Sequence, residues 1–168
     1  SGIEKLMTEC RSGMKEYELE AYFDFNCKIK GATDLAFTTI AAAGKNATTL
    51  HYVENNSKLK DGDLILFDLG AEYNCYNADI TRTFPISGKF TERQKEVYNS
   101  VLKVNEEIIN LIKPGMKYKD INEKATDLIA EECIKLGLIK DKSEVRKYYY
   151  HSIGHSLGMD THDIETPH

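Results

Sequence analysis

The order of hydrophobic patterns along the 168 residues predicts an α+β fold. Helix-type spacing dominates residues 1–31 and residues 91–137, whereas most strand-type runs lie between these two segments. Helices and strands that are segregated along a chain, instead of alternating, are typical of the α+β class. The length suits one domain with a substantial core, so we expect residues 1–168 to form a single domain.

Two helices are expected at the start of the chain. The first has apolar residues at the i, i+3, i+4 and i+7 positions of one helical face, namely Ile3, Leu6, Met7 and Cys10. Gly13 interrupts this pattern. The second helix covers residues 15–30, and Gly31 is placed as its C-terminal stop. Its many aromatic residues suggest that it is buried against a sheet.

Strands are expected in the middle of the chain. Residues 35–43 and 47–52 are rich in Phe, Thr, Ile and Ala, which predicts two strands joined by a turn at residues 44–46. A short apolar strand follows at residues 64–67. The run 72–86 predicts either a strand pair or one long bent strand.

Two further helices and a strand are expected in the last third. Thr91 and Gln94 form a capping box before a helix with one apolar face, made of Val97, Val101, Val104, Ile108 and Ile112. Asp120 repeats the capping pattern before another helix that runs to Gly137. Residues 148–151 then resume strand character.

The composition describes an ordinary globular protein and excludes several functional classes. Apolar residues make up 41% and charged residues 29% of the chain, and the net charge is −5. No basic cluster is present, because acidic residues accompany the basic ones, and this argues against nucleic-acid binding. No apolar run approaches the roughly 20 residues needed to cross a bilayer. The four cysteines form no Cys-x-x-Cys pair, which suggests free thiols in a reducing, cytoplasmic compartment.

Two carboxylates within a strand-like segment are the first candidates for chemistry. Asp68 follows a short apolar run that predicts a buried strand, and Asp79 comes eleven residues later in a second strand-like run. Neighbouring strands could therefore bring the two aspartates together. Two adjacent carboxylates cannot both stay ionised unless they share a proton or bind a metal. The alternative is one buried salt bridge and one surface turn.

Histidines are the second set of candidates. His151, His155 and His162 lie within twelve residues, and His51 precedes the Asp68 strand. The His151 and His155 spacing could ligate zinc from a helix, but Gly154 and Gly158 disfavour a helix there. We therefore expect the imidazoles to surround a pocket with separate roles. A hydrogen-bonded structural role is the alternative for each histidine.

Several separated motifs, in the same order, closely resemble the Xaa-Pro aminopeptidases (aminopeptidase P) of the pita-bread metallopeptidase superfamily. The matching motifs are Leu50-His-Tyr52, Lys60-Asp-Gly-Asp63, the Asp68 to Asp79 spacing, Asp79-Ile-Thr-Arg-Thr-Phe-Pro85, Gly88-Lys-Phe-Thr91 and the segment 151–163. They cover nearly the whole chain. The Asp79 to Pro85 motif indicates the proline-specific branch of the superfamily. The resemblance implies a mostly antiparallel, curved sheet covered by helices.

The resemblance also implies a site with two divalent ions, manganese first, with cobalt or zinc as alternatives. Asp68, Asp79 and His155 match three of the five ligands, and the two ligand glutamates are expected after His168. The same resemblance puts His162 beside the scissile carbonyl as a catalytic residue. It puts His51 in the substrate pocket, with a catalytic and a substrate-binding role, and His151 at a substrate-binding position.

The implied activity is hydrolysis of the N-terminal Xaa-Pro peptide bond by a water that bridges the two ions. The expected partners are peptides with proline at the second position, with no nucleic acid and no membrane, and the protein is expected to be a homo-oligomer. An N-terminal domain and the last C-terminal strands are expected to be missing from these 168 residues, which would leave them nearly inactive. The alternative is a metal-free pita-bread module that binds peptides or proteins.

Overall fold

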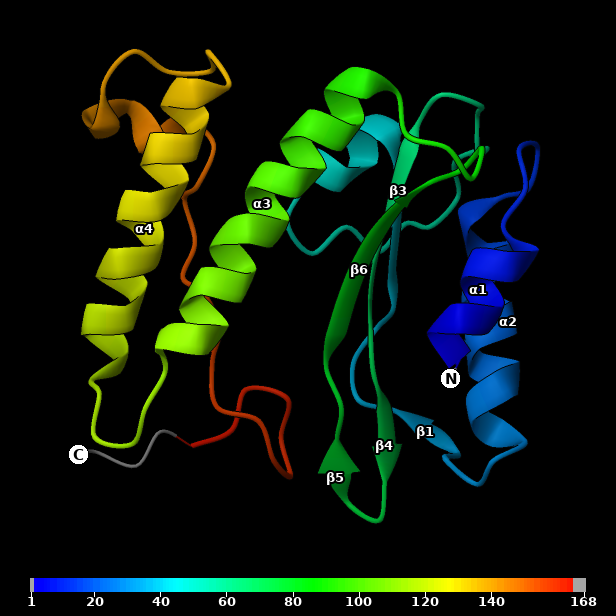
Figure 1. The fold of residues 1–168 in the computed structure, drawn as a ribbon. Helices are drawn as coiled ribbons and strands as arrows, with labels where there is room; N and C mark the ends of the chain where they lie inside the picture. Colours follow the sequence, from blue (N-terminus) through cyan, green and yellow to red (C-terminus); the bar gives the residue numbers. More distant parts are fainter. Residues whose placement is uncertain (1, 165–168) are drawn as a thin grey trace. The chain divides into compact units, whose positions relative to one another are not determined.

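The computed structural model describes residues 2–164, and the chain divides into two compact units. The first unit contains the residues up to Phe90 together with those from His155 onward. The second unit is Thr91–Gly154. The expectation that an N-terminal domain and the last C-terminal strands are missing concerns the ends of the chain. Both end residues, Ser1 and His168, lie outside the described residues. Figure 1 shows the helices and strands of each unit.

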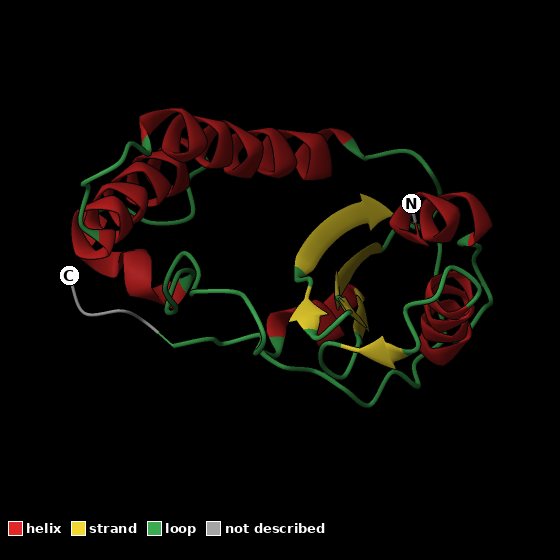
Figure 2. Ribbon diagram, turned by 90° about the horizontal axis from the view of Figure 1, so that it is seen from below, coloured by secondary structure: helices red, strands yellow, loops and turns green. Residues whose placement is uncertain are grey.

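The first unit begins with the two expected helices, α1 (Gly2–Glu9) and α2 (Glu16–Lys28). They pack together and contribute Leu6, Leu19 and Phe23 to the main core of this unit, where the strands supply the other side. Figure 2 shows the pair beside the strands. The expectation that the aromatic residues of α2 are buried holds for Phe23 but is wrong for Phe25, which is 61% exposed.

Two antiparallel sheets follow. The larger has the order β2 (Ile40–Ala43), β3 (Leu64–Leu69) and β6 (Ile80–Pro85), and the smaller has the order β1 (Asp34–Leu35), β4 (Ala71–Tyr73) and β5 (Tyr76–Asn77). Burial alternates along β3, so that Ile65, Phe67 and Leu69 face the main core. The other face of β3 therefore carries Leu66 and Asp68.

The prediction of a strand at residues 47–52 is wrong. This segment instead forms a 3₁₀ helix, η1 (Gly44–Thr48), followed by a turn at His51. The run at residues 72–86 is divided among three strands, because the chain reverses at Asn74 and Cys75 with positive φ angles of 52° and 66°. The prediction of a strand pair in this run is confirmed.

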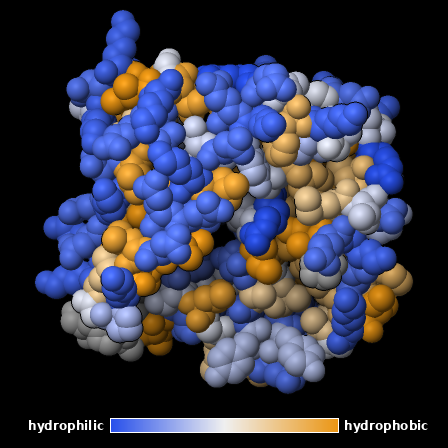
Figure 3. Space-filling view, in the orientation of Figure 1, coloured by the Kyte–Doolittle hydropathy of each residue, from blue (hydrophilic) through white to orange (hydrophobic). Residues whose placement is uncertain are grey.

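The second unit contains α3 (Glu92–Leu111), α4 (Tyr118–Lys135) and a 3₁₀ helix, η2 (Lys142–Lys147). The capping box of α3 is confirmed, because the Gln94 backbone N–H donates to Thr91 Oγ1 at 3.2 Å. Only Val104 and Ile108 of the predicted apolar face are buried, and they pack on α4. Val101, which belongs to the same apolar face, is 65% exposed. Figure 3 shows a largely hydrophilic surface over α3 and α4 with scattered hydrophobic side chains.

Two other predictions for this unit are wrong. Helix α4 begins at Tyr118, so Asp120 lies in its first turn and does not cap it. Residues 148–151 are all described and none of them lies in a strand. Tyr149 is instead buried against Ala130 and Cys133 of α4.

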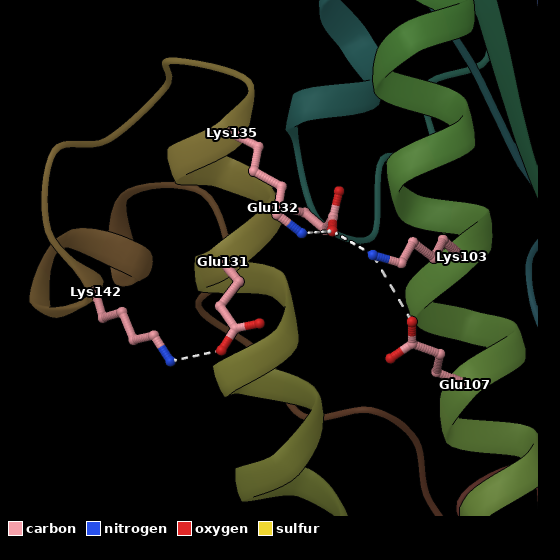
Figure 4. A network of polar contacts seen from close by, with 6 residues as sticks. All are labelled: Lys103, Glu107, Glu131, Glu132, Lys135 and Lys142. Carbon is pink, nitrogen blue, oxygen red and sulfur yellow. Dashed lines mark hydrogen bonds and ion pairs between the residues drawn. The ribbon is translucent and has the colours of Figure 1, made fainter.

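Polar side chains link the elements of the second unit. Glu132 of α4 accepts from Lys103 of α3 at 2.8 Å and from Lys135 at 2.7 Å (Figure 4). Lys142 of η2 contacts Glu131 at 2.9 Å (Figure 4).

Among residues 2–164, no helix combines the length and the apolar character that a bilayer crossing requires.

Candidate metal centre

Asp68 lies on β3, on the face opposite the main core. The antiparallel register places it across from Thr81 of β6 and Ile40 of β2. Thr81 Oγ1 donates to Asp68 Oδ1 at 2.8 Å. Burial raises the pKa of the Asp68 carboxyl, and the adjacent Asp79 raises it further, whereas the Thr81 hydroxyl and His51 lower it. Burial and the neighbouring Asp79 thus disfavour the ionised form of Asp68, and a bound cation would favour it.

Asp79 directly precedes β6 and contacts both other candidate ligands. Its carboxyl lies within hydrogen-bonding reach of the Asp68 carboxyl. Its Oδ2 atom lies 3.0 Å from His155 Nε2. The structure therefore brings Asp68, Asp79 and His155 together in one continuous chain of contacts.

The orientation of the His155 ring suits a metal ligand. Its Nδ1 atom lies 2.9 Å from the Ser156 carbonyl oxygen, which can only accept, so Nδ1 carries a hydrogen. Its Nε2 atom then faces the Asp79 carboxylate across 3.0 Å, a geometry that requires a proton or a cation between them. A ligating histidine commonly holds its other nitrogen on a backbone carbonyl in this way.

His162 lies beside His155, with ring centroids 4.0 Å apart. Both belong to a loop that is fixed to the sheets of the first unit. Thr161 Oγ1 donates to the Ala36 carbonyl at 3.0 Å. Asn77 donates from its backbone to Gly158 and from its side chain to Met159, each at 2.8 Å.

The donor atoms fit a divalent cation in type but do not complete a site. Two carboxylates and an imidazole nitrogen are a suitable set for Mn, Co, Fe or Zn. Within residues 2–164, however, no group of three or more His, Cys, Asp or Glu side chains is arranged so that it could hold a metal ion. In this structure the Asp68 and Asp79 carboxyl groups are close enough to affect each other's ionisation, and further ligands would be needed to enclose an ion.

The two remaining histidines have different surroundings. His51 is exposed and close enough to Asp68 to lower the pKa of that carboxyl. His151 belongs to the second unit, where its ring lies edge-on to Tyr149 at 4.8 Å. The roles predicted for His51, His151 and His162 stay predictions.

Two residues that support the site were not predicted from the sequence. Thr81 binds Asp68, and Asn77 holds the loop that carries His155 and His162. Thr81 could be found only from the strand register, because it faces Asp68 across a ladder that the sequence does not show. Asn77 gave no signal beyond its place in the strand-like run 72–86.

The family model for metallopeptidase family M24 matches residues 1–168. The chain belongs to metallopeptidase family M24. A Dictyostelium discoideum protein named Xaa-Pro aminopeptidase 3 is 49% identical over 154 residues, which are 90% of this chain and 30% of that protein. The M24 match confirms the family predicted from the motifs.

Solved structures confirm the fold of this M24 chain. A Bacillus anthracis structure provisionally named aminopeptidase P has a TM-score of 0.96 at 50% identity over 98% of this chain and 39% of that one. A zinc-substituted Escherichia coli aminopeptidase P in complex with product has a TM-score of 0.94 at 37% identity, with the same coverage. The predicted α+β class and pita-bread fold are therefore confirmed. The chain spans about a third of the length of the curated relatives it matches.

Proposed function

We propose that the protein is a divalent-metal-dependent aminopeptidase that hydrolyses the N-terminal Xaa-Pro bond of peptides. The observation that carries this proposal is the contact series Asp68, Asp79 and His155, which joins the three predicted ligands in a chain of the M24 family. Relatives named Xaa-Pro aminopeptidase support the choice of substrate.

Each site residue would have a distinct task. Asp68 and Asp79 would hold the ions through their carboxylate oxygens, and His155 would bind through Nε2 while Ser156 fixes its ring. Bound divalent ions supply Lewis-acid polarisation and a water of lowered pKa. His162 would stabilise the substrate carbonyl as it becomes tetrahedral. His51 and His151 would contact the peptide.

Three finer expectations remain predictions from the sequence. They are manganese as the physiological ion, a cytoplasmic location and a homo-oligomeric assembly. The metal-free binding module is the alternative that the following experiment separates from the enzyme.

The test measures release of the first residue from an Xaa-Pro-Yaa peptide by the full-length protein with Mn²⁺ or Co²⁺. We expect Asp79→Ala to reduce kcat/KM by at least about 100-fold, because it removes a ligand that also contacts the other two. Asp61→Ala, at an exposed turn, is the matched control and should keep full activity. Full activity of Asp79→Ala would contradict the proposal, and tight peptide binding without cleavage would favour the binding module.

A further inference from the structure

A fully buried carboxylate stands outside the candidate metal centre. Glu16, in the first turn of α2, has no exposed surface, although glutamates at this helical position are usually in water. A buried carboxylate is costly unless hydrogen bonds satisfy its oxygens. The partners of Glu16 therefore indicate what it holds in place.

The Glu16 carboxylate accepts hydrogen bonds from three separate segments of the first unit. Its Oε1 atom accepts from the Ala43 backbone N–H at 2.8 Å and from Asn46 Nδ2 at 2.9 Å. Its Oε2 atom accepts from Tyr52 Oη and from the Ser57 backbone N–H, both at 2.8 Å. Both oxygens are thus satisfied, and the carboxylate ties the end of β2 and η1 to the loop 51–57.

This loop has an unusual backbone at His51. The φ angle of His51 is 53°, in the left-handed region that non-glycine residues seldom adopt. Such conformations cost free energy and persist only where the surroundings impose them, often at functional sites. Asn55, at φ 44°, is the second such residue in the loop.

The side chains of Tyr52 and Asn55, which hold this backbone, are both buried. The Tyr52 ring packs against Ile40 and Leu66, on the face of β3 that carries Asp68. Burial raises the pKa of the Tyr52 hydroxyl, as does the bond to Glu16, so the hydroxyl stays a donor. The Asn55 side chain pairs with the edge of β2, accepting from the Ala41 backbone N–H at 2.9 Å.

These anchors account for the position of His51. Because Tyr52 is fixed by its ring and by its hydroxyl, the backbone of the preceding residue, His51, is held in its left-handed conformation. We propose that Glu16 is a positioning residue, which, by holding Tyr52 Oη and the Ser57 backbone, presents His51 to the peptide substrate. This inference rests on the proposed function, in which His51 contacts the peptide.

Tyr52→Phe is the main test, because it keeps the buried ring and removes only the hydroxyl that binds Glu16. In the full-length protein with Mn²⁺, we expect KM for an Xaa-Pro-Yaa peptide to rise about tenfold, the order expected for loss of a hydrogen bond to a charged group. The value of kcat should change less than KM, since the lost interaction serves substrate binding. Tyr22→Phe, at a 42% exposed position on the same helix, should leave both constants unchanged.

A double-mutant cycle separates positioning from general stability. If Glu16 acts through His51, Tyr52→Phe should have no further effect on KM in a His51→Ala background. Additive effects would overturn the proposal. Glu16→Gln should behave like Tyr52→Phe in the same cycle. It should raise KM by a larger factor and have no further effect on KM in the His51→Ala background.

A spectroscopic measurement serves as the readout that does not depend on activity. The carbon chemical shifts and the amide to Hα coupling of His51 report its left-handed backbone, and both should change in Tyr52→Phe but not in Tyr22→Phe. Unchanged spectra and an unchanged KM in an active Tyr52→Phe protein would refute the role of Glu16. Absence of Xaa-Pro cleavage by the wild type would instead refute the proposed function.

Discussion

Glu132 shows how a single carboxylate links two helices of the second unit. Its side chain is only 13% exposed and accepts from Lys103 on α3 and Lys135 on α4. The hydrogen bonds from these two lysines lower the pKa of Glu132 from 4.5 to about 2. Because the folded-state pKa is lowered, this stabilisation is fully present above pH 4.5. It is lost as the pH falls from about 4.5 towards about 2.

Glu132→Gln should therefore destabilise the protein at pH 7 and have no effect near pH 2. We expect a loss of at most about 1 kcal/mol, since the two lysines are more than half exposed and solvent screens the pairs. Urea unfolding of both proteins across this pH range measures the difference. Glu123→Gln removes a pair that is 3.7 Å long and well exposed, and it should leave the stability unchanged. An effect of Glu132→Gln that does not depend on pH would show that the side chain acts through packing.

At the scale of elements, the helices and the central strands could be predicted from the sequence because local patterns encode them. The spacing of apolar residues predicted α1 and α2, and a capping box predicted the start of α3. The apolar run before Asp68 predicted β3. These signals depend only on residues within one or two turns of each other, so the sequence displays them directly.

The elements that could not be predicted depend on partners distant in the chain. Residues 47–52 have strand-like composition, but Asn46 and Tyr52 bind Glu16, thirty or more residues earlier, and this fixes a 3₁₀ turn. Tyr149 has high strand propensity, yet burial against α4 decides its conformation. In the site, the contact of Asp68 with Asp79 was predicted, whereas the strand register that adds Thr81 was not.

Gly70 connects β3 to β4 at the point where the chain passes closest to Ala78. A Cβ atom at Gly70 would lie 1.7 Å from the Ala78 carbonyl oxygen, so even alanine forces the backbone to shift. Gly70 is two residues from Asp68, and Ala78 directly precedes Asp79. This close approach therefore helps to bring the two aspartates together.

Gly70→Ala should destabilise the protein by about 1–3 kcal/mol, the usual range for overpacking. Urea unfolding measures this loss. In the absence of urea, the amide chemical shifts of Asp68 and Asp79 should differ between the variant and the wild type. Gly115→Ala is the control, because a Cβ there meets no atom within 4 Å and only its φ angle of 89° opposes the change. The amide chemical-shift changes that Gly115→Ala causes should not include Asp68 or Asp79. Wild-type stability of Gly70→Ala would contradict the close approach of the two segments.

At the scale of the whole molecule, the chain consists of two compact units with their own hydrophobic clusters. The expectation that residues 1–168 form a single catalytic domain stays a prediction. The first unit holds Asp68, Asp79, His155 and His162, although His155 comes 76 positions after Asp79 in the sequence. The return of the chain to the first unit at His155 is what assembles the candidate metal centre.

The number of ligands in the 168 residues leads to a prediction about metal binding. Three donor side chains are too few to enclose two divalent ions, and within residues 2–164 they do not form a group that could hold one. Titration calorimetry of the 168-residue chain with Mn²⁺ should therefore show only weak binding, and Asp79→Ala should remove it. The full-length protein should bind two ions if glutamates outside this segment complete the set, as the resemblance implies. Two tight sites in the 168-residue chain alone would refute this ligand assignment, because the ions would then need donors other than the five that the family resemblance implies.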